Sequence, residues 1–243
     1  MKVAVIPARY NSTRLPGKPL KLLAGKSIIQ CVYEKVQAAG LFQKVIVATD
    51  DIRIRDAVLA FGGAVQITSP NHRSGSDRIA EVVADMPADI VVNVQGDEPF
   101  ITTAALQTLV DQFQNKSVQV ASLMHAMQKD FANPNRVKVV CDREGFALYF
   151  SRSPIPFHRQ QDAIQRYFQH IGVYAYRKPA LMKFVQHEPT FLEKTEKLEQ
   201  LRFLENGTRI KMVQTNYKGF GIDTLEDLKA AEKLLNVLEN TTK

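Results

Sequence analysis

The chain has 243 residues, a formal net charge of +7, and ordinary hydrophobic (45%) and charged (23%) contents. These values predict a globular protein with one large α/β domain, or a domain with a sizeable appendage, and exclude a disordered chain. No apolar run has the length of a membrane-spanning helix or resembles a signal peptide, so we expect no membrane insertion and a cytoplasmic location. The cations do not form a basic tail, which favours a small anionic ligand over nucleic acid.

The two cysteines, Cys31 and Cys141, lie far apart in the sequence. Neither has the neighbouring Cys or His residues of a zinc site. We interpret both as packed thiols in a reducing compartment.

Short apolar runs alternate with segments of helical periodicity in the first half of the chain. We expect strands at 3–6, 44–49, 64–68, 89–94 and 118–123. We expect helices at 28–39 (opened by Ser27 and ended by Gly40), at 52–61 (capped by Asp50 or Asp51), from Ser76 or Asp77 to about 85, and at 103–113. This rhythm predicts a Rossmann-like, doubly wound and mostly parallel sheet.

The second half has a different pattern. It predicts a hairpin from 137–142 and 146–151, strands at 171–176 and 210–215, and helices at 179–187, 194–205 and 225–238. We therefore expect a single domain over 1–243, with an inserted mixed α/β layer at 125–190.

A cationic loop follows the first strand. It contains Arg9, Arg14 and Lys18 together with the small residues Asn11, Ser12, Thr13 and Gly17. Backbone N–H groups and small side chains allow a polyphosphate to approach, and the cations neutralise its charge. Because apolar residues become scarce after Pro7, we do not expect the loop to be core. The order strand, cationic loop, helix is typical of nucleotide-binding α/β units.

The acidic turn QGDEP (95–99) follows the strand expected at 89–94. Ligands of open α/β sheets bind at the carboxyl ends of strands, so we expect Asp97 and Glu98 beside the cationic loop, where they are candidate ligands for Mg²⁺. Gly96 permits a close backbone approach. Asp223, in GFGIDTLEDL, is a further candidate, although Asp223 or Thr224 could simply cap the last helix.

A third polar loop, RSGSDR (73–78), precedes a helix, and its amides could bind a base or a phosphate. Arg78 could equally be a surface residue of that helix. The three loops together indicate Mg²⁺-assisted nucleotidyl transfer, in which the acceptor supplies the nucleophile. No GxSxG, HExxH or GxxxxGK[ST] motif is present, which argues against the corresponding hydrolases, zincins and P-loop enzymes.

Eight segments in order along the chain resemble the 3-deoxy-manno-octulosonate (Kdo) cytidylyltransferase family. They are IPARYNSTRLPGKPL, VIVATDD, RSGSDRIAEV, VNVQGDEPFI, ALYFSRSPIPF, HIGVYAY, EKLEQLRFLENG and GIDTLEDL, and they span residues 6–228. The resemblance implies a nucleotidyltransferase fold and a reaction of CTP with Kdo that gives CMP-Kdo and pyrophosphate for lipopolysaccharide synthesis. It also implies a homodimer, for which 125–166 is a candidate contact region.

The resemblance assigns roles to residues in both halves of the chain. For CTP it implies Ala8, Arg9, Arg14, Lys18, Ser74, Gly75, Arg78 and Gln95, with Lys18 on the developing charge and Gln95 also at the junction with the sugar. For the metal it implies Asp97 and Asp223. For the sugar acid it implies Arg152, His170, Tyr174, Glu199 and Gln200. Arg152 suits a carboxylate and the other four suit hydroxyls. From the residues alone, Tyr174 could be core, and Glu199 and Gln200 could lie on an exposed helix face.

The sequence departs from the family pattern near its end. Family members commonly have GTGVDTPEDL where this chain has GFGIDTLEDL. We interpret the bulkier Phe220 and Leu225 as packing variations, because Asp223 and Glu226 are kept.

Four alternatives remain open. The first is the same reaction with 8-amino-Kdo in place of Kdo. A sialic acid fits less well, because HIGVYAY and EKLEQLR resemble the Kdo branch. A nucleic-acid-binding protein lacks an aromatic platform, and a glycosyltransferase would need a second, spaced Asp in the GDE turn.

Overall fold

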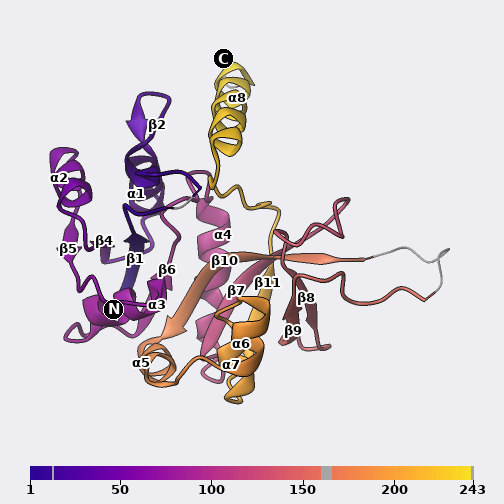
Figure 1. The fold of residues 1–243 in the computed structure, drawn as a ribbon. Helices are drawn as coiled ribbons and strands as arrows, with labels where there is room; N and C mark the ends of the chain where they lie inside the picture. The colour runs from indigo at the N-terminus through magenta and orange to yellow at the C-terminus, as the bar shows by residue number, and fades with distance from the viewer. Residues whose placement is uncertain (13, 160–165, 242–243) are drawn as a thin grey trace. The chain divides into compact units, whose positions relative to one another are not determined.

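A computed structural model describes residues 1–12, 14–159 and 166–241, with the backbone alone for 236–241 (Figure 1). Thr13 of the cationic loop and residues 160–165 of the expected dimer contact lie outside the described residues. The chain divides into two compact units. Unit 1 combines Met1–Leu106 with Gly219–Lys243, and unit 2 is Gln107–Lys218. Unit 2 contains the 125–190 layer expected from sequence and is longer at both ends.

Unit 1 contains a parallel sheet of four strands, β1 (Lys2–Ala8), β4 (Lys44–Thr49), β5 (Val65–Ile67) and β6 (Ile90–Asn93). Their order is β5-β4-β1-β6, so the connection after β5 reverses direction across the sheet. Right-handed crossovers then place α1 and α2 on one face and α3 on the other. The expected doubly wound parallel sheet is confirmed. Its strands are continuously apolar because both faces are covered.

The helices of unit 1 begin at residues whose side chains accept backbone hydrogen bonds. Ser27 caps α1 (Ile28–Ala38), Asp51 caps α2 (Ile52–Ala60), and Gly40 follows α1 with φ of 68°. The predicted start of α3 (Gly75–Val83) was wrong by two residues. Ser74 caps this helix instead of Ser76 or Asp77, because the side chain of Asp77 bonds back to Ser74 in a capping box.

A small hairpin and a 3₁₀ turn between β1 and α1 were not predicted from the sequence. Leu22–Leu23 (β2) pairs with Lys26–Ser27 (β3), and Lys18–Leu20 forms η1. Leu15 of the cationic loop is buried with Leu23, Ile28 and Leu228, so one apolar residue of that loop does join the core. α4 (Thr103–Asp111) follows β6, and α8 (Leu225–Thr241) ends the described chain.

Unit 2 is a mixed α/β unit, as expected. Its strands are β7 (Val120–Ala126), β8 (Lys138–Cys141), β9 (Ala147–Ser151), β10 (Phe168–Arg177) and β11 (Ile210–Gln214). β11 is parallel to β7, and β10 is antiparallel to it. β8 pairs with β9 as the predicted hairpin. The remaining elements are η2 (Gln112–Gln114), α5 (Lys178–Gln186), α6 (Phe191–Glu196) and α7 (Leu201–Glu205).

The single helix predicted at 194–205 was wrong. The chain forms α6 and α7, separated by Lys197, whose backbone is left-handed with φ of 53°. A capping box of Thr190 and Glu193 starts the first helix at Phe191, three residues earlier than predicted. The buried ion pair between Arg202 and Glu193 (2.5 Å) fixes the two helices against each other.

Both cysteines are free thiols, and burial raises the pKa of each, to about 11 for Cys141. No helix in the described part of the chain is both long enough and apolar enough to span a membrane.

Candidate functional site

The cationic loop and the QGDEP turn leave the carboxyl ends of β1 and β6, which are adjacent strands of unit 1. The strand order changes direction at this pair, and open α/β sheets bind ligands at such a point. The close approach expected at Gly96 is confirmed. A Cβ added there would lie 3.0 Å from the carbonyl oxygen of Pro7. Only glycine allows the acidic turn to sit this near to β1.

Four charged side chains meet at this edge of unit 1. Lys18 Nζ lies 2.5 Å from Asp97 Oδ2 and 3.0 Å from Asp223 Oδ1, and Arg14 Nη2 lies 2.9 Å from Asp223 Oδ2. Burial disfavours the Lys18 ammonium, but the charges and hydrogen bonds of the two aspartates outweigh it and raise the pKa of Lys18. The site therefore combines two cations and two carboxylates that are far apart in the sequence.

Two hydrogen bonds hold the chain that carries Asp223 against the acidic turn. The N–H of Ile222 donates to the Asp97 carbonyl (3.0 Å), and the N–H of Phe220 donates to Glu98 Oε2 (3.1 Å). The buried Glu98 carboxylate therefore binds the backbone of this segment, whereas the Asp97 carboxylate contacts Lys18. Phe220 packs edge-to-face on Phe100 with ring centroids 5.4 Å apart, so its bulk is a packing variation as expected.

Helix capping does not account for Asp223. Thr224 Oγ1 accepts from the N–H of Asp227, and Asp227 Oδ2 accepts from the N–H of Thr224. This capping box starts α8 and leaves the Asp223 carboxylate for Arg14 and Lys18.

The donor set suits Mg²⁺. The carboxylates of Asp97 and Asp223 already converge on one cationic group, the ammonium of Lys18. Mg²⁺ takes one or two protein carboxylates and completes its shell with phosphates and water. No group of three or more His, Cys, Asp or Glu side chains in the described residues forms a self-sufficient metal site. The residues thus fit a metal that arrives with a phosphate ligand.

The third polar loop lies against β1. A Cβ added at Gly75 would lie 3.4 Å from Pro7, and the hydroxyl of Ser74 is engaged in the cap of α3. Ala8 is buried at the end of β1, and exposed Arg9 donates to the carbonyl of His72 (2.7 Å).

Arg78 is not the surface residue that was one alternative. Its side chain is fully buried, its Nη2 lies 3.1 Å from Asp50 Oδ2, and it bonds the hydroxyl of Thr68. Its guanidinium therefore contacts Asp50 and Thr68 inside unit 1 and is not presented to solvent. Gln95 donates to Asn93 Oδ1 (2.9 Å).

Unit 2 holds five of the six residues expected to contact the sugar acid, and the sixth, Gln95, belongs to unit 1. Arg152 Nε donates to the Glu196 carbonyl (2.7 Å), Nη1 to the Pro134 carbonyl (2.9 Å) and Nη2 to the Lys197 carbonyl (3.2 Å). A guanidinium has five N–H groups, so one remains on each terminal nitrogen. That pair suits a carboxylate.

His170 and Tyr174 lie side by side on β10 with ring centroids 5.3 Å apart. Burial lowers the pKa of His170 to about 3, so its imidazole is neutral. Burial, with the charges of Tyr176 and Glu199, raises the pKa of Tyr174 well above its ordinary value. Tyr174 is half-buried, so it is not simply core.

Glu199 and Gln200 do not lie on an exposed helix face. They occupy the turn between α6 and α7, where Glu199 is half-buried and Gln200 is buried. The charge of Glu199 contributes to the raised pKa of Tyr174.

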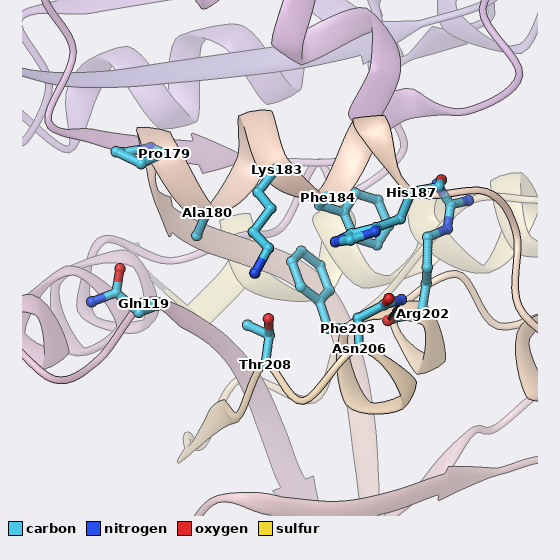
Figure 2. Close-up of a pocket in the computed structure, with 10 residues that line it drawn as sticks. All are labelled: Gln119, Pro179, Ala180, Lys183, Phe184, His187, Arg202, Phe203, Asn206 and Thr208. Carbon is cyan, nitrogen blue, oxygen red and sulfur yellow. Dashed lines mark hydrogen bonds between the residues drawn. The ribbon is translucent and has the colours of Figure 1, made fainter.

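Two pockets lie elsewhere. One, of about 280 Å³ within unit 2, lies between α5 and α7 and contains Lys183, Phe184 and Phe203 (Figure 2). The other, of about 410 Å³ in unit 1, lies around Tyr33 and Lys44. None of the predicted site residues lines either pocket.

Sequence reasoning missed three residues that hold the candidate sugar-binding groups. Glu196 accepts from the Ser151 hydroxyl (2.6 Å) and the Arg152 N–H (3.0 Å), buried Lys138 donates to the Arg152 carbonyl (2.5 Å), and Ser122 bonds His170. Of the three, only Lys138 could have been noticed in the sequence, as a lysine within an apolar strand pattern. The others depend on contacts between distant segments.

The cytidylyltransferase family matches residues 3–210. The 3-deoxy-manno-octulosonate cytidylyltransferase of Flavobacterium johnsoniae is 51% identical over 96% of this chain and 98% of the relative. The enzyme of that name from Geobacter metallireducens is 49% identical over 96% and 98%.

Solved structures agree. A CMP:2-keto-3-deoxy-manno-octonic acid synthetase complexed with CTP superposes with a TM-score of 0.93 at 43% identity, covering 97% of this chain and 98% of that one. A 4-diphosphocytidyl-2C-methyl-D-erythritol synthase from Anaerococcus prevotii, at 15% identity and a TM-score of 0.66 over 97% and 98%, shares the fold. The chain belongs to the cytidylyltransferase family and, within it, groups with the 3-deoxy-manno-octulosonate cytidylyltransferases.

Proposed function

We propose that this protein transfers CMP from CTP to the anomeric hydroxyl of Kdo, releasing pyrophosphate, in a Mg²⁺-dependent reaction that serves lipopolysaccharide synthesis in the cytoplasm. The observation that carries the proposal is the convergence of Lys18 and Arg14 with Asp97 and Asp223 at the carboxyl ends of β1 and β6. Nucleotidyl transfer needs cations for the leaving pyrophosphate and carboxylates for a metal, and this cluster supplies both.

The residues of unit 1 bind and activate the nucleotide. Arg9 and Arg14 are exposed and neutralise phosphate charge, while half-buried Lys18 contacts the charge that develops on the leaving group. Ala8, Ser74, Gly75 and Gln95 surround the base and the α-phosphate, and Arg78 supports them from beneath. Asp97 and Asp223 would hold Mg²⁺, which when bound withdraws charge from the phosphates and favours loss of the acceptor's proton.

The residues of unit 2 bind the acceptor. Arg152 directs its two remaining N–H groups to the carboxylate of the sugar acid. His170, Tyr174, Glu199 and Gln200 bind its hydroxyls. No described side chain needs to form a covalent intermediate, because the anomeric hydroxyl attacks the α-phosphorus directly and positioning supplies much of the rate.

A pyrophosphate-release assay tests the reaction. We expect release only when CTP, Mg²⁺ and Kdo are all present, with UTP, sialic acid and 8-amino-Kdo as comparison substrates. Release with another sugar acid alone would keep the nucleotide half and overturn the acceptor. Release without Mg²⁺ in the presence of EDTA would overturn the metal requirement.

Substitution of Asp97 or Asp223 should lower the rate of catalysis without weakening the binding of Kdo. We expect Asp97→Asn and Asp223→Asn each to lower kcat by about 10²- to 10³-fold, the range found when one charge-stabilising group is removed. The KM for Kdo should change little. Asp227→Asn, which alters the cap of α8 and the bond to the Asp223 N–H but removes no candidate metal ligand, is the matched control for stability. A loss in KM for Kdo alone would contradict the assignment.

A homodimer is part of the proposal. Phe157, in the segment expected to form the contact, is 87% exposed, so its ring is available for burial against another chain. Light scattering after gel filtration should give twice the 27.3 kDa mass of the chain. Phe157→Ser should shift the equilibrium to monomer.

A further inference from the structure

Ser122 on β7 is fully buried, and three polar atoms of β10 surround its hydroxyl. Its Oγ lies 3.0 Å from His170 Nε2, 2.9 Å from the Val173 carbonyl oxygen and 3.2 Å from the Ile171 carbonyl oxygen. This arrangement decides how His170 can interact with a ligand.

A bulge in β10 creates the contact. Ile171 pairs with Leu123, but the next pair is Tyr174 with Ser122, so Gly172 and Val173 are extra residues. A bulge disrupts the ladder and leaves backbone groups unpaired. Paired residues of neighbouring strands share a face of the sheet, so the Ser122 side chain lies on the face of His170 and Tyr174.

The tautomer of His170 follows from counting protons. A hydroxyl has one proton, and a carbonyl oxygen can only accept. With two carbonyl oxygens beside it, the Ser122 hydroxyl donates to one of them, the nearer being that of Val173. It then offers only a lone pair to His170, which favours the tautomer with the proton on Nε2. In a neutral imidazole the other nitrogen, Nδ1, is an acceptor.

The surroundings of His170 support the neutral form. The ring of Phe150 meets the imidazole edge-to-face at 5.1 Å, and burial lowers the pKa of His170 to about 3. Among the described residues, no hydrogen-bond partner is found for Nδ1, so that lone pair is available to a ligand.

We propose that Ser122 is a positioning residue that holds His170 with its proton on Nε2, so that Nδ1 accepts a hydrogen bond from a hydroxyl of the acceptor sugar. The sugar contact rests on the proposed function, whereas the tautomer does not. An acceptor atom at this position requires a donor on the substrate, which makes His170 selective for a free hydroxyl over a methylated or deoxygenated one.

Nitrogen-15 NMR of the full chain tests the tautomer without any substrate. His170→Asn identifies the His170 signals among those of the five histidines. At neutral pH we expect a protonated Nε2 and an unprotonated Nδ1. A proton on Nδ1, an equal mixture, or a doubly protonated ring would each overturn the proposal.

Ser122→Ala then tests the positioning role. It should mix the two tautomers of His170 and raise the KM for Kdo by about tenfold, the effect of losing about 1.4 kcal/mol of binding, while the KM for CTP stays within about twofold. Ser122→Thr, which keeps the hydroxyl, should retain the wild-type tautomer. Ser117→Ala, in an exposed loop, is the matched control. An unchanged tautomer in Ser122→Ala would contradict the inference. A wild-type protein that releases no pyrophosphate with CTP, Mg²⁺ and Kdo would contradict the proposed function instead.

Discussion

At the scale of single residues, Lys18 is the cation that pairs with both carboxylates of the candidate site. Its side chain is 16% exposed, and its ammonium pairs with both Asp97 and Asp223. Without ligand it separates two carboxylates that would otherwise repel each other. Of the three cations of the loop it is the least exposed, so its charge is the least screened by water.

Replacing this ammonium should affect both stability and rate. Lys18→Met should lower the free energy of unfolding by about 1 kcal/mol, because two partly buried carboxylates lose their shared partner. It should lower kcat by about 10²- to 10³-fold. Urea unfolding and the pyrophosphate assay measure the two effects. Lys26→Met, which breaks an exposed pair with Glu34, should change neither. Equal effects of the two variants would contradict this role.

His170 should make stability depend on pH. Burial lowers its pKa from 6.5 to about 3, so between these values the unfolded chain binds a proton that the folded protein does not. Its contribution is fully present above about pH 6.5 and declines as the pH falls towards 3. Burial also lowers the pKa of His125, which adds in the same direction. In urea unfolding from pH 7 to 4, His170→Asn should show a shallower decline than the wild type, and an equal decline would contradict the assignment.

At the scale of elements, the turn after β6 depends on a backbone contact more than on side chains. The carbonyl of Pro7 approaches Gly96 so closely that an added Cβ would lie at 3.0 Å. Since Asp97 follows directly, the placement of the carboxylate depends on this contact.

Gly96→Ala should therefore lower the free energy of unfolding by about 1–3 kcal/mol, as overpacking does elsewhere, and should reduce kcat with it. Gly221→Ala is the control for stability, because its Cβ would meet nothing nearer than 3.8 Å. The melting temperatures of the two variants, measured by thermal unfolding, test this expectation. Equal melting temperatures would mean that the turn tolerates a side chain.

The elements also show what sequence reasoning could predict. Periodicity gave β4 at Lys44–Thr49 without error, and the caps Ser27 and Asp51 gave the starts of α1 and α2. Motif order gave Lys18, Asp97 and Asp223, which the structure brings together. The break at Lys197 was missed because a lysine with positive φ has no local signal. Ser122 was missed because its role depends on a bulge in another strand.

At the scale of the whole molecule, the net charge of +7 should appear in the kinetics. CTP carries several negative charges and Kdo carries one, so salt should screen the first interaction more strongly. Between about 0.05 and 0.3 M KCl the KM for CTP should rise several-fold, and the KM for Kdo should rise by less than about twofold. Steady-state assays at fixed Mg²⁺ measure both. Equal salt dependence would contradict a localised cationic site.

The two-part composition of unit 1 has a consequence for synthesis of the protein. Asp97 leaves the ribosome more than a hundred residues before Asp223, with all of unit 2 made in between. The apolar cluster that contains Leu15, Leu23 and Ile28 is likewise incomplete until Leu228 and Ala231 have been synthesised. A nascent chain that has not yet reached α8 can form the parallel sheet but has half of its carboxylate pair. The cluster of Lys18 with its two aspartates is thus completed late in translation, and a chain that terminates before Asp223 leaves Lys18 with a single aspartate.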